Sequence, residues 1–224
     1  MGTTFDTYCG LCCATCEFKD SMNCGGCIAS EGKPFHGACE VAECAKAKKR
    51  NFCGDCENFP CDLLKKYSND PEHGDNGARI ENCSRIKSAL VAEAREGLNP
   101  LAVCGFNCNH CFLGQWCGGC RSSYNCCSHA TLFEDNQCPN VVCATAKGLE
   151  GCYLCDQLDD CKIGFYSKED EHVAKAAALF IREYGPERSE QALTRQIEAA
   201  KATGKELETA TSVEEAFEML KKYL

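Results

Sequence analysis

Cysteine is the residue type that could do chemistry in this chain, since it accounts for 24 of the 224 residues. Ten cysteines recur in the same order in each half. Both series contain C-x3-C-x2-C, then C-G-G-C, then C-x4-C-x8-C-x2-C. Thiolates at such spacings bind zinc or iron–sulfur clusters, so the repetition predicts two modules with metal sites of one kind. The predicted ligands are Cys9, Cys13, Cys16, Cys24, Cys27, Cys39, Cys44, Cys53, Cys56 and Cys61, and then Cys104, Cys108, Cys111, Cys117, Cys120, Cys138, Cys143, Cys152, Cys155 and Cys161.

Each series fills two four-cysteine centres and leaves two thiols, so the simplest count is four centres. One grouping places the opening triad and the C-G-G-C pair around one centre, and the last five cysteines around another. Their order alone does not fix the grouping. Zinc and iron–sulfur clusters both accept four thiolates. The all-cysteine ligand set, the acidity of the chain and the repeated layout favour [4Fe-4S] clusters, with Zn2+ as the alternative.

Four cysteines have no counterpart in the other series, and two histidines recur at the same interval after a Tyr-Ser pair. We interpret Cys12, Cys83, Cys126 and Cys127 as buried small side chains or incidental thiols. His73 and His172 are interpreted as exposed residues at helix starts. An enzyme that uses a reactive thiol would depend on these spare cysteines alone, so the prediction is a non-catalytic electron-transfer or binding protein.

The formal net charge is −9, from 33 acidic and 24 basic residues. This balance argues against nucleic acid as a partner, because phosphate binding needs a basic surface. Another protein, either a redox partner or a subunit of a larger complex, is expected instead. The first residues lack a secretory signal, and no apolar run approaches the roughly 18 residues that span a bilayer. We therefore expect a cytoplasmic protein without membrane contact, whose thiols stay reduced.

The repeat predicts two domains, residues 1–98 and 99–224, with Gly97, Asn99 and Pro100 at the boundary. In each domain the cysteines come first and a helical tail follows. Turn-forming residues interrupt the cysteine-rich parts, so only short helices are expected there, at 40–49 and 141–147. The expected fold is small and mainly α, with irregular, cysteine-rich, metal-clamped lobes in tandem and helical tails.

The tails have ordinary helical patterns. A short helix is expected after Cys61 and a longer one over 78–96. In the second tail, Ser167 and Asp170 form a predicted capping box ahead of an apolar stripe that ends at Gly185. Another helix follows through Leu193, Ile197 and Ala200. Ser212 and Glu215 predict the cap of the last helix.

The first series resembles an uncharacterised cysteine-rich domain family found largely in anaerobic bacteria and archaea. The resemblance is carried by C-G-L-x-C-x-x-C from Cys9, C-G-G-C from Cys24, and C-G-D-C-x-x-F-P-C from Cys53. The second series departs from this pattern, with Phe106 in place of Leu11 and Asp159-Asp160 before its last cysteine. The family has no assigned reaction, and its anaerobic distribution implies oxygen-sensitive clusters. The overall prediction is a tandem metal-binding protein for electron transfer, or else a structural zinc module that mediates protein interaction.

Overall fold

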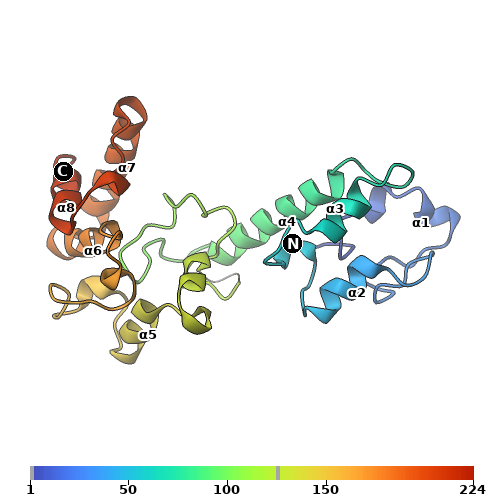
Figure 1. Cartoon of the computed structure of the whole chain (residues 1–224), viewed down its shortest axis with the longest axis horizontal. Coiled ribbons are helices and arrows are strands. Elements are labelled where there is room, and N and C mark those ends of the chain that lie inside the picture. The colour runs from blue at the N-terminus through green and yellow to red at the C-terminus, as the bar shows by residue number, and fades with distance from the viewer. Residues whose placement is uncertain (1–2, 125–126) are drawn as a thin grey trace. The chain divides into compact units, whose positions relative to one another are not determined.

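The computed structural model describes residues 3–124 and 127–224, and helices are the regular elements within them. No strand forms in these ranges, where the extended pairing is one isolated bridge between Leu101 and Asn107. The contacts divide the chain into a first unit, Met1–Ala94, and a second unit, Arg95–Leu224. The prediction of small, mainly helical, irregular and cysteine-rich lobes is confirmed (Figure 1).

The first unit consists of short helices around a small apolar core. Its helices are α1 (Phe18–Ser21), α2 (Glu40–Ala47), α3 (Asp62–Ser68) and α4 (Ala78–Arg95), with 3-10 turns at Cys13–Thr15 and Cys53–Asp55. Phe52 and Leu64 are fully buried, and Cys83 and Ile86 of α4 complete the core. Four cysteines that were predicted as ligands belong to or pack against this core: Cys9, Cys39, Cys53 and Cys61. A core of this size gives the unit little hydrophobic stabilisation of its own.

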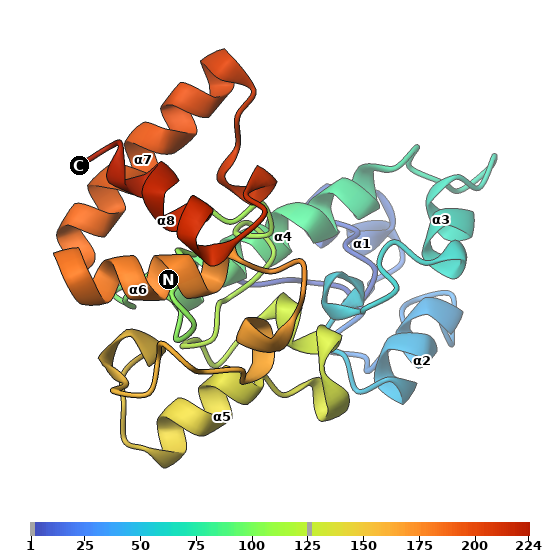
Figure 2. The same cartoon turned by 60° about the vertical axis from the view of Figure 1, so that its left-hand side comes forward.

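The second unit begins with irregular chain and ends in a helical bundle. Its irregular part contains α5 (Pro139–Ala146) and 3-10 turns at Ser128–Leu132, Glu134–Asn136, Cys152–Leu154 and Gly164–Ser167. The bundle comprises α6 (Val173–Tyr184), α7 (Pro186–Thr203) and α8 (Val213–Lys221), with a turn at Leu207–Thr209. Helix α6 lies beside α8 in both ribbon views (Figures 1 and 2). Phe180 of α6 and Leu220 of α8 are buried between them.

One of the two predicted helix caps is wrong and the other is confirmed. Ser167 bonds back to the Gly164 carbonyl at 2.8 Å within its own 3-10 turn, so it does not cap α6. The Glu171 carboxylate accepts from the Ala174 N–H at 3.1 Å instead. Ser212 does cap α8, since its hydroxyl accepts from the Glu215 N–H at 3.1 Å.

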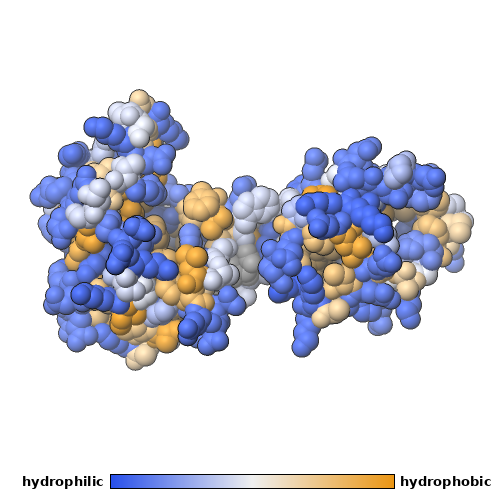
Figure 3. Space-filling view, in the orientation of Figure 1, coloured by the Kyte–Doolittle hydropathy of each residue, from blue (hydrophilic) through white to orange (hydrophobic). Residues whose placement is uncertain are grey.

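Hydrophilic residues cover much of the face in Figure 3, with apolar residues gathered in patches between them. Among the residues that the structure describes, no helix combines the length and the apolarity needed to cross a membrane.

A glycine in each unit lets the chain pass directly over a helix. Gly10 has φ +85°, and a Cβ there would lie 2.4 Å from the Arg79 carbonyl oxygen of α4. Gly105 has φ +98°, and its Cβ would lie 2.6 Å from the Ala178 nitrogen of α6. Both glycines directly follow the first cysteine of a series. The two cysteine series are therefore attached to their helical tails in the same way.

We expect Gly105→Ala to destabilise the second unit by about 2–4 kcal/mol, because the new methyl group combines backbone strain with overpacking. Gly148→Ala is the matched control, since Gly148 also has a positive φ of +67° but its Cβ would meet nothing within 4 Å. Gly148→Ala should lower the free energy of unfolding by about 1 kcal/mol, from backbone strain alone. Denaturant midpoints of the helical circular dichroism signal measure both. Equal losses for the two variants would contradict the close packing at Gly105.

Candidate metal centres

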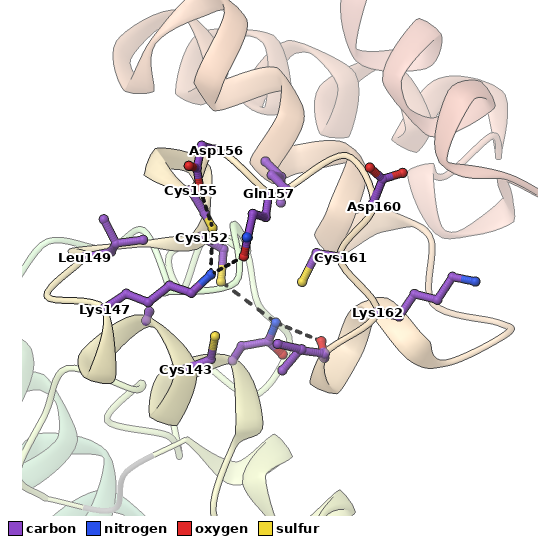
Figure 4. Close-up of a pocket in the computed structure, with 14 residues that line it drawn as sticks. Cys143, Lys147, Leu149, Cys152, Cys155, Asp156, Gln157, Asp160, Cys161 and Lys162 are labelled. Carbon is purple, nitrogen blue, oxygen red and sulfur yellow. Dashed lines mark hydrogen bonds between the residues drawn. The ribbon is translucent and has the colours of Figure 1, made fainter.

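A pocket of about 500 Å³ in the second unit is lined by four of the predicted cysteine ligands. Cys143 lies on α5, Cys152 begins the next 3-10 turn, Cys155 directly follows that turn, and Cys161 comes in the next loop. Figure 4 shows their sulfur atoms facing the same space. We call these residues the Cys143 group. Their backbone turns tightly because C-x2-C here forms a single 3-10 turn, closed by the Cys155 N–H on the Cys152 carbonyl at 3.0 Å.

Polar side chains surround the sulfurs of the Cys143 group. The Lys147 ammonium lies 3.4 Å from the Cys155 sulfur, and this contact raises the pKa of Lys147. The buried Asn140 amide nitrogen lies 3.9 Å from the Cys152 sulfur and is held by the Ile163 carbonyl at 3.1 Å. Burial raises the pKa of the Cys152 thiol, although hydrogen bonds from Tyr166 and Asn140 oppose that rise. A cation in the pocket would reverse the effect of burial, since thiols lose their protons when they ligate metals.

The first unit places the corresponding cysteines in a similar neighbourhood. Burial is the main cause of the raised pKa of Cys53. The charges of four other cysteines add to the rise, namely Cys83, Cys9, Cys61 and Cys44. Lys48 stands four residues after Cys44, as Lys147 does after Cys143, and its ammonium lies 3.8 Å from the Cys56 sulfur. We call Cys44, Cys53, Cys56 and Cys61 the Cys44 group.

One backbone hydrogen bond recurs beside both groups. The Cys53 N–H donates to the Tyr8 carbonyl at 2.7 Å, and the Cys152 N–H donates to the Val103 carbonyl at 2.7 Å. Tyr8 and Val103 each directly precede the first cysteine of a series. In both units, this bond joins the first cysteine of the later C-x2-C pair to the residue that precedes the first cysteine of the series.

A second group forms around the C-G-G-C segment of each unit. Cys27 has the sulfurs of Cys9, Cys39 and Cys13 near enough to raise its pKa, although burial raises it more. In the second unit, burial and then the sulfurs of Cys120, Cys138 and Cys152 raise the pKa of Cys104. Burial raises the pKa of Cys108 to about 11, and the charge of Cys120 adds to this rise. Cys39 thus lies near Cys27 of C-G-G-C and Cys138 near Cys104, so neither is confined to the later cysteines with which the grouping suggested from sequence placed it.

The remaining predicted ligands are Cys16 and Cys24 in the first unit and Cys111 and Cys117 in the second. Backbone N–H groups surround Cys117, with that of Ser128 at 3.1 Å and that of Gly119 at 3.4 Å from its sulfur. The N–H groups of Phe35 and Gly26 bond Cys24 in the same way and lower its pKa. A histidine follows in both cases, because His36 comes after Phe35 and His129 after Ser128.

His129 lies beside one of these cysteines, although the sequence prediction did not include it among the ligands. Its ring nitrogen Nε2 lies 3.9 Å from the Cys111 sulfur. The interval C-x11-H recurs in both series, from Cys24 to His36 and from Cys117 to His129, and it is the signal that could have identified this residue. His110, beside Cys108 and Cys111, is held elsewhere, since its Nε2 lies 3.0 Å from the Glu190 carboxylate.

The unmatched residues have varied surroundings. Cys12 is exposed, and Cys83 is fully buried where α4 meets Gly10. Burial raises the pKa of Cys83 to about 12. Cys127 is partly buried beside Cys117, and Cys126 lies outside the described residues. His73 is exposed but lies in the turn between α3 and α4, and His172 stands at the start of α6 but is half-buried, so each agrees with only half of its prediction.

The sulfurs of these groups are neighbours without being tightly packed. Within residues 3–124 and 127–224, no three Cys, His, Asp or Glu side chains converge closely enough to hold a single ion. Any bound metal would either occupy a wider space or draw the side chains together.

Comparison with known proteins bears on the first unit. Residues 5–66 match the family described as "Protein of unknown function (DUF3795)", and this range holds all ten cysteines of the first series. The match agrees with the resemblance to an uncharacterised cysteine-rich family. No curated protein and no solved structure matches the chain. The cysteine content and this family are compatible with metal binding, and neither identifies the metal.

Proposed function

We propose that the protein carries [4Fe-4S] clusters, one in the Cys143 group and one in the Cys44 group, and that it transfers single electrons to or from another protein. The observation that carries this proposal is the pocket of about 500 Å³ lined by four cysteines from one short stretch of chain. A bound cluster would supply one-electron redox chemistry. The protein's own residues would hold it, limit its exposure to water and set its potential.

The size of the pocket supports a cluster over a mononuclear ion. Zinc–sulfur bonds of about 2.3 Å place the four sulfurs of a tetrahedral zinc site about 3.8 Å apart. Cys143, Cys152, Cys155 and Cys161 instead line, together with ten other residues, a pocket of about 500 Å³. Four thiols around such a space fit a larger, multinuclear group.

The donors around the sulfurs support a redox role. Lys147 and Lys48 each bring an ammonium group to the second cysteine of a C-x2-C pair. Hydrogen bonds and positive charge at the sulfurs are means by which a protein sets a cluster's reduction potential. A lysine thus approaches the equivalent sulfur in each unit. A purely structural set of ligands would not require such a lysine.

We further propose that the second unit is a second copy of the family domain that residues 5–66 match. Three features recur in the two units: the glycine that passes over a helix, the backbone bond to the residue before the first cysteine, and the lysine at the C-x2-C pair. The two copies would give one electron carrier with at least two centres. An acidic chain of charge −9 suits a protein partner with a basic docking surface in a reducing, oxygen-poor cytoplasm.

The test is metal and sulfide analysis on full-length protein purified without oxygen. Two clusters predict about eight iron and eight sulfide per chain, with a broad absorption band near roughly 400 nm that bleaches on reduction. Electron paramagnetic resonance of the reduced protein would then count the centres. Stoichiometric zinc with no iron would overturn the proposal and favour a structural zinc module.

The contact of Lys147 with Cys155 leads to a prediction about potential. Lys147→Met should lower the reduction potential of the second-unit cluster by about 30–60 mV, a roughly three- to tenfold change in a one-electron equilibrium, because the reduced state loses a nearby positive charge. Lys162→Met is the control, since Lys162 lines the same pocket and points away from the sulfurs (Figure 4). Redox titration of each variant gives the values. Equal shifts in both variants would refute the specific role of Lys147.

A further inference from the structure

We infer that the second unit also holds a mononuclear zinc ion, bound by Cys111, Cys117, Cys127 and His129. This site is separate from the Cys143 group and does not depend on iron there. It includes two residues, Cys127 and His129, that the cysteine repeat does not contain. Three thiolates and one imidazole form a ligand set common to structural zinc sites.

The contact between Cys111 and His129 has the dimension of one edge of a zinc tetrahedron. The Cys111 sulfur and His129 Nε2 are 3.9 Å apart. Zinc–sulfur bonds of about 2.3 Å and zinc–nitrogen bonds of about 2.0–2.1 Å place the two donor atoms about 3.6 Å apart in a tetrahedral site. This pair therefore needs little adjustment to share one ion, in contrast to the wide space enclosed by the Cys143 group.

The other two ligands form a second contacting pair beside the first. The Cys127 thiol hydrogen-bonds the Cys117 sulfur. Between Cys127 and His129 lies Ser128, whose N–H donates to the Cys117 sulfur at 3.1 Å. The short segment 127–129 thus contacts Cys117 twice and Cys111 once. A zinc ion would draw these two pairs onto one point, and the Ser128 and Gly119 N–H groups would remain as hydrogen-bond donors to the thiolate.

Aromatic rings surround the imidazole of His129. Phe106 stacks on it with ring centroids 6.3 Å apart, and Phe165 and Phe112 approach edge-on at 6.1 and 6.2 Å. These rings pack around the imidazole and help to fix its orientation beside Cys111. His110 is a poorer candidate although it is close in sequence, because its ring nitrogen already bonds the Glu190 carboxylate.

Comparison of the units places the site in the second one. The first unit has Cys24 and His36 at the same interval and the same pattern of N–H groups around the cysteine. At the position of Cys127, however, it has Pro34, which has no donor for zinc. The complete set of four ligands therefore occurs in the second unit, where Cys127 stands at this position.

The test is nuclear magnetic resonance of the full-length protein loaded with 113Cd2+ as a stand-in for zinc. Among the bound cadmium ions, the site predicts one resonance that is scalar-coupled to the ring protons of His129. His129→Cys should keep the number of bound cadmium ions, because a fourth thiolate replaces the imidazole, and should abolish that coupling. Exposed His73 provides the control, since His73→Gln should leave the coupling unchanged.

Cys127→Ser is the second variant and should lose one bound cadmium ion together with the coupling. Wild-type protein whose cadmium resonances show no coupling to His129 would overturn the inference. So would a Cys127→Ser variant that keeps the coupling at full intensity. Neither result depends on whether the Cys143 group holds an iron–sulfur cluster, so the two proposals can fail separately.

Discussion

Replacing Cys143 by serine should remove about four of the iron atoms bound to the protein purified without oxygen, and about four sulfides with them. Cys143 lies on α5 and contributes one of the four sulfurs around the pocket. The other three come from the chain between residues 152 and 161. A [4Fe-4S] cluster needs all four ligands for stable binding, and a serine oxygen is a poor substitute for a thiolate. Iron and sulfide analysis with visible absorption measures the loss.

The first unit offers a matched variant. Cys44→Ser changes the corresponding cysteine of α2 and should also remove about four iron atoms, and the double variant should lose about eight, because each unit has its own complete group. Exposed Cys12 provides the negative control, since Cys12→Ser should leave the iron content unchanged. A Cys143→Ser protein with its full iron content would remove the Cys143 group from the proposal.

The sequence predicted the helices more reliably than the grouping of the cysteines. The helices expected at 78–96 and over the last tail occur as α4, α6, α7 and α8, because long apolar periodicity determines a helix locally. The Ser167 capping box was wrong, since Gly164 with φ +60° begins a separate turn that uses the serine hydroxyl. A local pattern could not reveal this competition between two turns.

The grouping of the ligands could not be predicted, because all candidates are the same residue type and order does not determine which loops meet. Only four residues lie between Cys39 and Cys44, yet Cys39 influences Cys27 while Cys44 influences Cys53. The helix α2 begins directly after Cys39 and carries Cys44 in its second turn. The interval from Cys117 to His129 was in the sequence, but only the contact with Cys111 gives it meaning.

Removing the metals should unfold the cysteine-rich part of the second unit and leave helices α6, α7 and α8 folded. Structural zinc contributes about 10–16 kcal/mol to the folding of small domains, as much as the whole stability of many proteins. The core of the cysteine-rich part includes predicted ligands themselves, among them Cys104, Cys138 and Cys152. Without metal, these thiols cannot replace that contribution. Hydrogen exchange before and after chelation under reducing conditions measures the loss, segment by segment.

The bundle should persist because its core is ordinary hydrocarbon. Phe180 is fully buried, with Tyr184 and Phe217 at ring-centroid distances of 4.6 and 5.3 Å, and Leu207 and Leu220 are also buried. Phe180→Ala supplies the reciprocal control: it should cost about 3–5 kcal/mol in the bundle and leave the metal content unchanged. If chelation exposed the amides of α6–α8 as fully as those of residues 101–167, the bundle would depend on the metal centres for its folding. Protection that survives in the bundle alone would show that the chain joins metal-dependent lobes to a hydrophobic support that folds without them.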